Sequence, residues 1–198
     1  MLNFMPNLSF FPALLGLILT ISLPRVASAD ATPTPAQDSL AFPESWVGVW
    51  TGELTISGPQ GPVQQLPMEL HILPLDTVDR FSWTIIYGED KEAGARKYQL
   101  QVIDRAKGLY AVDELNSIVL ESYYRPNKLF SRYLVGEIMI LITNEVRGDT
   151  MTFEVIAGGS EPVSITGDTT LVVDGESIPE VRTYPIGATQ KATLTRKK

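Results

Sequence analysis

His71 is the only histidine in this chain of 198 residues, and cysteine is absent. Without cysteine the chain has no thiolate nucleophile, no zinc–thiolate site and no disulfide. A serine–histidine–acid triad would have to use His71, and no G-x-S-x-G turn accompanies it. Because His71 falls on the polar side of an alternating segment, we expect a solvated strand histidine and neither a haem ligand nor a catalytic base.

Acidic residues form two small groups. Asp168, Asp174 and Glu176 lie near a glycine but lack the spacing of a calcium loop. Asp113 and Glu114 fall at a predicted turn, where such residues stabilise the turn itself. General acid–base catalysis would need one of these carboxylates to face a cavity with a raised pKa. We therefore predict no catalytic residue, no metal site and no bound cofactor.

Aromatic residues offer a different chemistry, the binding of an apolar molecule. Phe81, Trp83 and Tyr87 occupy alternate positions of one segment. The residues that we predict to point inward and to contact a ligand are Trp50, Met68, Leu70, Phe81, Trp83, Tyr87, Tyr98 and Tyr133, with Met139 beside them. A lining with tyrosine hydroxyls suits an apolar ligand that carries a polar group, although the same residues would equally form a filled core.

The segment 46–56 predicts the strand around which the others are arranged. Alternate residues place Gly48, Trp50 and Gly52 on one side, and polar residues such as Glu53 on the other. This period of two is typical of a strand with one face in a core and one in water. Glycines beside a tryptophan indicate that a neighbouring backbone passes close while the indole fills a large interior space.

Many short strands follow, and no segment has a helical period. The predicted strands lie at 66–72, 81–87, 98–102, 109–112, 118–123, 129–135, 138–142, 151–156 and 192–196, with weaker ones at 163–166 and 171–173. Tight successive turns favour a meander, and closure removes exposed sheet edges. We therefore predict an all-β fold, an antiparallel up-and-down barrel of about 8–10 strands. The segment 138–142 is apolar on both faces, so it should be buried on both or covered by a loop.

The G-x-W pattern of Gly48 and Trp50 resembles the calycin superfamily, the lipocalins and their small-barrel relatives. The resemblance implies a lipocalin-like barrel, and a basic residue near its end that packs over the tryptophan, for which Arg196 is the match. A looser likeness is to the nitrobindin-type haem barrels, whose G-x-W-x-G-x-G pattern Gly52 continues and Leu54 breaks. The lipocalin T-D-Y motif and the helix before the last strand are absent from the sequence. We assign Gly48, Trp50, Gly52 and Arg196 structural roles.

The beginning of the chain has the features of an export signal. An apolar run at 8–23 is followed by small residues up to Ala29 at the positions that an export peptidase recognises. We predict a signal peptide at 1–29, cleaved after Ala29, a flexible linker at 30–43 and a barrel domain at 44–198. No Lys or Arg precedes the run, so an uncleaved anchor stays the alternative. In both cases we expect the domain to be exported, either periplasmic or secreted. If the signal peptide is cleaved, we expect no integral membrane domain in the mature protein.

The net charge of −7 argues against a polyanionic partner such as nucleic acid, because phosphate binding needs a basic surface. The first functional hypothesis is a non-enzymatic carrier or sensor of a small hydrophobic molecule. The second is a structural or interaction module whose barrel is filled by side chains. The third, and least favoured, is a carboxylate-based hydrolase or isomerase.

Overall fold

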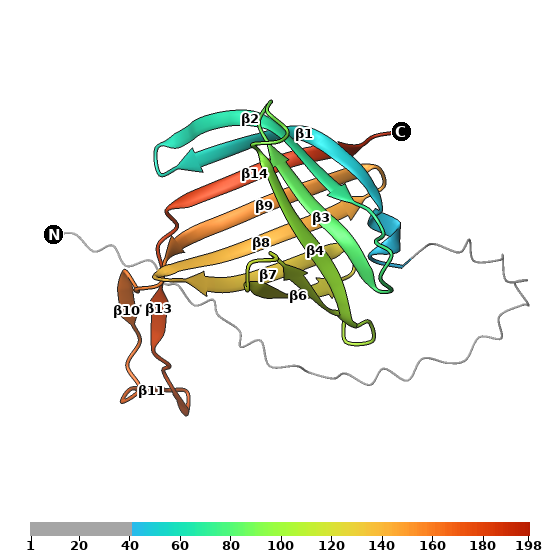
Figure 1. Cartoon of the computed structure of the whole chain (residues 1–198). Coiled ribbons are helices and arrows are strands. Elements are labelled where there is room, and N and C mark those ends of the chain that lie inside the picture. The colour runs from blue at the N-terminus through green and yellow to red at the C-terminus, as the bar shows by residue number, and fades with distance from the viewer. Residues whose placement is uncertain (1–40) are drawn as a thin grey trace, which may run out of the picture. The chain divides into compact units, whose positions relative to one another are not determined.

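Ten antiparallel strands close into a barrel in the computed structural model, which describes residues 41–198 (Figure 1). The predicted signal peptide and residues 30–40 of the predicted linker lie outside the described residues. The barrel strands are β1 (Gly48–Gly58), β2 (Gly61–Ile72), β3 (Arg80–Tyr87), β4 (Ala95–Asp104), β5 (Leu109–Asp113), β6 (Val119–Arg125), β7 (Lys128–Val135), β8 (Ile138–Arg147), β9 (Thr150–Gly159) and β14 (Ala188–Arg196).

The strand order is that of a simple meander. Each strand from β1 to β9 pairs with the next in sequence, and β14 pairs with both β9 and β1. The predicted all-β, antiparallel up-and-down barrel is therefore confirmed, and its ten strands fall within the expected number. In its coarse architecture, this barrel fits the lipocalin-like barrel that the sequence resemblance implies. No helix in residues 41–198 has the length and apolar character needed to cross a bilayer.

The two ends of the barrel differ. We call one the closed end; it carries the 3-10 helix η1 (Glu44–Trp46) and the turns at 73–79, 105–108, 126–127 and 148–149. We call the other the open end; it carries the turns at 59–60, 88–94, 114–118 and 136–137, and the connection from β9 to β14. Side chains fill the barrel toward the closed end, whereas a cavity opens at the other.

The interior follows directly from the alternation in the sequence. On β3, Phe81, Trp83 and Ile85 are buried while the residues between them are half-buried on the outer face. On β1, a Cβ atom at Gly52 would overlap the carbonyl oxygen of Thr193 on β14. A side chain at this position would therefore force the two strands apart, which explains a glycine inside the strand.

β8 is apolar on both faces, and the structure covers both. Ile140 and Ile142 point into the barrel, whereas Met139 and Leu141 line a groove on the outer face together with residues 184–186. The expectation that a loop covers this strand agrees with that arrangement. The placement of Met139 inside the barrel is wrong, because an uninterrupted apolar run leaves the inward-facing set of residues undetermined.

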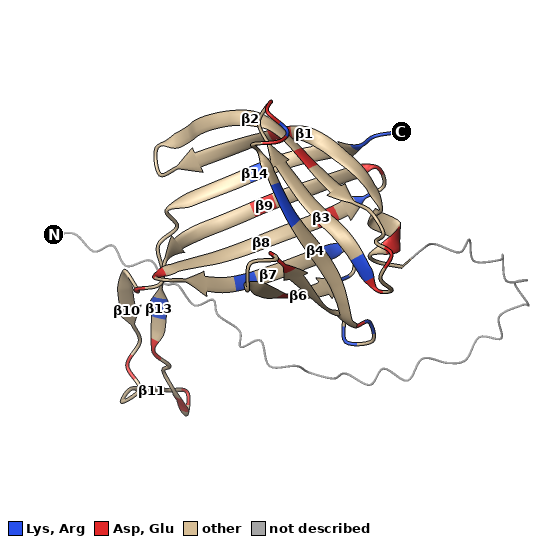
Figure 2. Ribbon diagram, in the orientation of Figure 1, with Lys and Arg blue, Asp and Glu red and all other residues tan. Residues whose placement is uncertain are grey.

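The connection between β9 and β14 forms a projecting hairpin, which we call the arm (residues 160–187; Figure 1). Within it β10 (Ser164–Thr166) pairs with β13 (Val181–Thr183), and β11 (Val172–Val173) pairs with β12 (Glu176–Ser177). The weak strands predicted at 163–166 and 171–173 lie here. The arm contains five acidic residues and one arginine, a net charge of −4 (Figure 2).

Candidate functional site

The closed end is built around Trp50, which has an exposed fraction of 0%. The Nε1 group of Trp50 donates a hydrogen bond to the carbonyl oxygen of Trp46 at 2.9 Å. The guanidinium carbon of Arg196 lies 4.3 Å from the centroid of the Trp50 ring, within cation–π range. The same guanidinium donates to the carbonyl oxygens of Val47 and Ser45, each at 2.9 Å. Arg196 thus lies over the tryptophan where the lipocalin resemblance places it, and it joins η1 to the last strand.

Gly48 makes room for this arrangement. Its φ of +147° is one that residues with a side chain rarely adopt, and a Cβ atom there would lie 3.3 Å from Cγ of Arg196. Both conditions favour glycine at this position.

Phe42 completes the closed end. Its exposed fraction is 4%, its ring stacks on that of Tyr124 at 4.4 Å, and it meets the edges of Trp46 and Tyr110 at 4.7 Å. Pro43 is buried beside it. These two residues belong to the folded barrel, so the predicted linker extends too far at its end. Neither belongs to an alternating segment, which is why the pattern did not include them.

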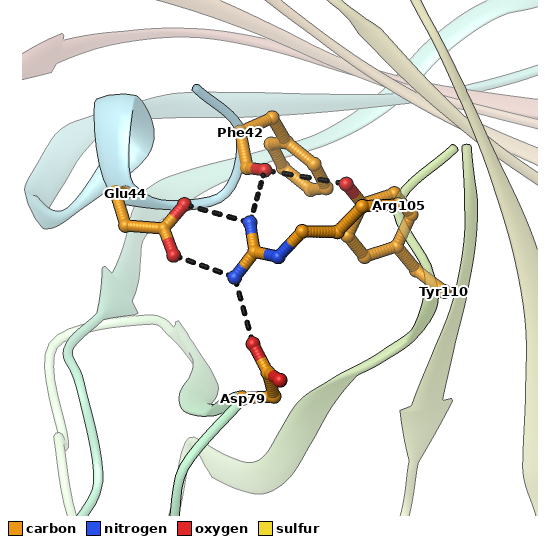
Figure 3. A network of polar contacts seen from close by, with 5 residues as sticks. All are labelled: Phe42, Glu44, Asp79, Arg105 and Tyr110. Carbon is orange, nitrogen blue, oxygen red and sulfur yellow. Dashed lines mark hydrogen bonds and ion pairs between the residues drawn. The ribbon is translucent and has the colours of Figure 1, made fainter. Parts of the chain in front are cut away.

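Arg105 holds the Phe42 segment in place (Figure 3). Its guanidinium donates to both carboxylate oxygens of Glu44 at 3.0 and 2.7 Å, to Asp79 at 2.8 Å and to the carbonyl oxygen of Phe42 at 3.1 Å. The hydroxyl of Tyr110 donates to the same carbonyl oxygen at 3.2 Å. The hydrogen bonds from Arg105 hold the pKa of Glu44 below its ordinary value of 4.5. This end of the barrel is therefore filled and tied down.

A cavity of ≈230 Å³ occupies the other part of the barrel. Its inner end is formed by residues that are almost entirely buried, namely Trp83, Leu129, Asn144 and Phe153. Its sides are mostly apolar and consist of Ile85, Val112, Leu120, Ser131, Ile142 and Val155. Along β8, Ile140, Ile142 and Asn144 follow one another from the open end inward. The cavity thus reaches deep into the barrel.

The mouth of the cavity lies at the open end and is more polar. It is lined by Tyr87, Tyr98, Tyr133, Glu114, Ile140 and Gln190, all of them half-buried. Burial raises the pKa of Tyr87 to about 12. Burial and the nearby charge of Glu114 also raise the pKa of Tyr98 and of Tyr133. All three phenols are therefore neutral near pH 7 and can donate hydrogen bonds at the mouth.

Two polar features involve residues of the buried part of the lining, Ser131 and Asn144. The hydroxyl groups of Ser122 and Ser131 form a hydrogen bond of 2.7 Å between β6 and β7. Asn144 is 4% exposed, and within residues 41–198 no donor is placed to bond its Oδ1 atom. A buried acceptor without a donor costs free energy, so this atom distinguishes the cavity from an ordinary core.

Four of the eight predicted ligand-contacting residues line the cavity: Trp83, Tyr87, Tyr98 and Tyr133. The other four, Trp50, Met68, Leu70 and Phe81, also belong to the barrel core but lie where it is filled. The alternation identified the inward face of each strand. It did not give the depth of each residue, which depends on how the tilted strands are staggered around the barrel.

Several lining residues are not among those that the sequence pattern predicted to contact a ligand. Asn144 continues the period of two that begins at Ile140, so its inward direction was available from the pattern once the inner face of β8 was known. Glu114 lies in the turn where it was predicted, and this turn brings its side chain to the mouth. Gln190 precedes the predicted closing strand, which starts earlier than the pattern indicated.

His71 lies outside the cavity. Its Nε2 atom is 2.8 Å from the carboxylate of Glu69, which also accepts a hydrogen bond from Lys91 at 2.7 Å. This placement agrees with a solvated strand histidine. Within the described part of the chain, no group of three or more histidine, aspartate or glutamate side chains could hold a metal ion.

The outer surface of the barrel also has hollows, of which two are the largest after the interior cavity is set aside. The groove over β8 and β9 measures ≈210 Å³ and is lined mainly by apolar residues, including Met139, Leu141 and Ile156. A second hollow of ≈460 Å³ over β1 and β14 is lined by polar residues such as Glu53 and Lys191. Neither combines enclosure with buried polar atoms as the interior cavity does.

Comparison with solved structures finds this architecture at low sequence identity. A protein of unknown function from the DUF3598 family of Nostoc punctiforme aligns over 76% of the chain, with a TM-score of 0.50 and 11% identity. The chain spans 47% of that protein, about half its length. The protein Rv2717c from M. tuberculosis aligns over 77% of this chain and 92% of its own, with a TM-score of 0.29 and 14% identity. No protein-family model and no curated protein matches the chain. The Nostoc likeness shows the barrel fold alone.

Proposed function

We propose that this protein is a non-enzymatic carrier or sensor of a small apolar molecule, held in the cavity of the barrel. The observation that carries the proposal is the contrast between the two ends. Side chains fill the closed end, whereas the open end leads into a cavity of ≈230 Å³ with mainly apolar sides. A barrel that served only as a scaffold would gain stability from filling this space as well.

The size of the cavity limits the ligand. An engineered protein cavity of about 150 Å³ holds benzene, so a cavity of ≈230 Å³ corresponds to about nine non-hydrogen atoms. Haem and long-chain lipids are much larger. The expected ligand is therefore a compact molecule with an apolar body and a polar group. The lining offers hydrogen-bonding side chains at both ends, the tyrosine hydroxyls at the mouth and Asn144 at the inner end.

Ligand binding can be measured without a label. Trp83 is the tryptophan that lines the cavity, while Trp46 and Trp50 lie in the filled closed end. A bound molecule should change the fluorescence of Trp83, and the change should vanish in Trp83→Phe although native mass spectrometry still detects the complex. If no apolar compound of this size binds by either method, the carrier proposal fails.

A pair of variants on β8 tests the location of the ligand. Ile142→Phe adds volume inside the cavity. Leu141→Phe makes the same kind of change at the neighbouring residue, which faces the outside of the barrel. We expect binding to be lost in the first variant and retained in the second. Equal affinity in both variants would place the ligand elsewhere.

An enzymatic role has less support. Glu114 is the one carboxylate among the cavity-lining residues, so the lining contains no pair of carboxylates of the kind that the hydrolase or isomerase hypothesis requires.

An interaction module is the second candidate, and the arm favours it. Large apolar side chains are exposed along its length, including Val163 at 65%, Val172 at 65% and Ile186 at 61%. Exposed apolar surface of this extent is typical of interaction sites. Replacing residues 161–186 by a short turn should abolish association with a partner and leave ligand binding unchanged.

We also propose that the barrel is of the calycin type and that the protein is exported. The positions of Gly48, Trp50 and Arg196 support the first proposal, and the apolar run at 8–23 supports the second. Protein recovered from the exported fraction should begin at Asp30. An N-terminus at Met1 would instead support an uncleaved anchor.

A further inference from the structure

If the protein is a carrier as proposed above, the chemistry of the cavity lining limits the class of ligand more narrowly than the volume of the cavity does. The sixteen lining residues include no lysine, arginine or histidine, and Glu114 is the one charged group among them. An ionised carboxylate drawn into the cavity would therefore meet no positive charge in the lining. Burying such a charge without a partner is costly.

The buried amide of Asn144 adds a directional requirement. Its Oδ1 atom is an acceptor for which residues 41–198 supply no donor. A neutral hydroxyl group can donate to this atom. An ionised carboxylate could only accept from the Nδ2 group of the same amide, and it would leave Oδ1 without a donor. Ser131 also lines the cavity and lies close to Asn144. It is the next inward-facing residue of β7 after Leu129, and Leu129 pairs with Asn144 on β8.

We propose that the cavity binds neutral molecules of about nine non-hydrogen atoms whose hydroxyl group donates to Asn144, and that it discriminates against carboxylates of the same length. Medium-chain alcohols and small phenols belong to this class. Their apolar body lies against Ile85, Ile142 and Val155, and their far end lies between the mouth tyrosines.

In the opposite orientation a carboxylate at the mouth could accept hydrogen bonds from the tyrosine hydroxyls, but its positive counter-charge would have to come from Arg96. This residue is exposed at the start of β4, and its guanidinium donates to the carbonyl oxygens of Ala93 and Ala95 in its own turn. A ligand oriented in this way would set a methyl group against Asn144 Oδ1 and a negative charge beside Glu114. The neutral orientation satisfies Asn144 and avoids Glu114, so the structure favours it.

The test compares 1-octanol with octanoate on the unaltered protein, by Trp83 fluorescence and native mass spectrometry. At pH 8 we expect octanoate to bind at least about 100-fold more weakly than octanol. At a pH below the pKa of the free acid, neutral octanoic acid carries a hydroxyl donor and should bind about as well as octanol. Circular dichroism at each pH verifies that the barrel is folded.

Asn144→Leu provides an independent measurement. Octanol affinity should fall about 3- to 10-fold, because one hydrogen bond is lost. The melting temperature of the ligand-free protein should rise, because a buried acceptor without a donor has been removed. A merely structural asparagine would instead give a lower melting temperature and an unchanged affinity, and this result would overturn the assignment.

The outcomes separate the two proposals. If neither octanol nor octanoate binds at any pH, the carrier function fails and this inference fails with it. If octanoate binds as tightly as octanol at pH 8, the carrier function stands and the selection of neutral ligands is wrong. Loss of that octanoate binding in Arg96→Gln would then place the head group at the mouth. The probe comparison needs no variant, so it decides the matter even if Asn144→Leu does not fold.

Discussion

Replacing Phe42 by alanine should destabilise the barrel strongly, although this residue lies before the first strand. The side chain is 4% exposed, stacks on Tyr124 and meets the ring edges of Trp46 and Tyr110. Buried phenylalanine-to-alanine substitutions cost about 3–5 kcal/mol, the sum of lost transfer free energy and the cavity that remains. The hydrogen bonds from the side chains of Arg105 and Tyr110 to the Phe42 carbonyl oxygen are retained, so we expect a loss of about 3–4 kcal/mol.

The measurements are urea-induced and thermal unfolding, each followed by tryptophan fluorescence. For a domain of this size, 1 kcal/mol corresponds to about 2–4 °C, so the melting temperature should fall by about 6–16 °C. Phe130→Ala is the matched control, because Phe130 is half-buried on β7 and has Lys128 5.4 Å from its ring centroid. It should cost about 1 kcal/mol or less. Equal losses in the two variants would refute the view that Phe42 is part of the folded barrel.

Three further predictions concern the two ends of the barrel. Gly52→Ala should lower the free energy of unfolding by about 1–3 kcal/mol, because its Cβ would overlap a carbonyl oxygen of β14, whereas Gly58→Ala, with nothing nearer than 3.7 Å, should change it little. The lowered pKa of Glu44 means that its pairing with Arg105 stabilises the fold above pH 4.5 and is lost as pH falls through the lowered value. Glu44→Gln should therefore lower the free energy of unfolding by up to about 1 kcal/mol at pH 7. Urea denaturation at lower pH should show a smaller difference in free energy between the variant and the unaltered protein. Because the pKa of Tyr87 is raised to about 12 in the folded protein, the contribution of this residue to stability is present below pH 10 and is lost as the pH rises toward about 12. Spectrophotometric titration of Tyr87→Phe should therefore lack the phenol that titrates near pH 12.

The extent to which the sequence predicts this molecule depends on what each pattern encodes. Alternation encodes direction, so it identified Trp83 and Tyr87 as inward residues and gave the number of strands closely. It does not encode depth, and the same reasoning therefore grouped Trp50, which lies in the filled end, with residues of the cavity. Depth follows from the stagger of strands around the barrel, which pairing between distant segments determines.

Other differences have local causes. Phe42 is a single apolar residue after a polar stretch, with no periodic neighbours that would mark it as core. Met139 was misplaced because both faces of β8 are apolar, and the outer face is covered by residues 184–186, which are distant in sequence. Asn144 could be placed inside the barrel from its spacing to Ile140, but its unsatisfied Oδ1 atom depends on neighbours that only the fold brings together.

The arm should unfold independently of the ten-stranded barrel and at a lower free-energy cost. β9 and β14 already pair at Ala157 and Ala188, so the ten-stranded ring is complete without the residues between them. A two-stranded ribbon without a third strand is marginally stable in water. Amide hydrogens of β10 and β13 should therefore exchange with solvent through local opening, while those of β9 and β14 exchange only when the whole ring unfolds. A protease cut at the exposed Asp174–Gly175 turn should leave a nicked but intact ring, which makes this turn a natural position for new chain termini or an inserted domain.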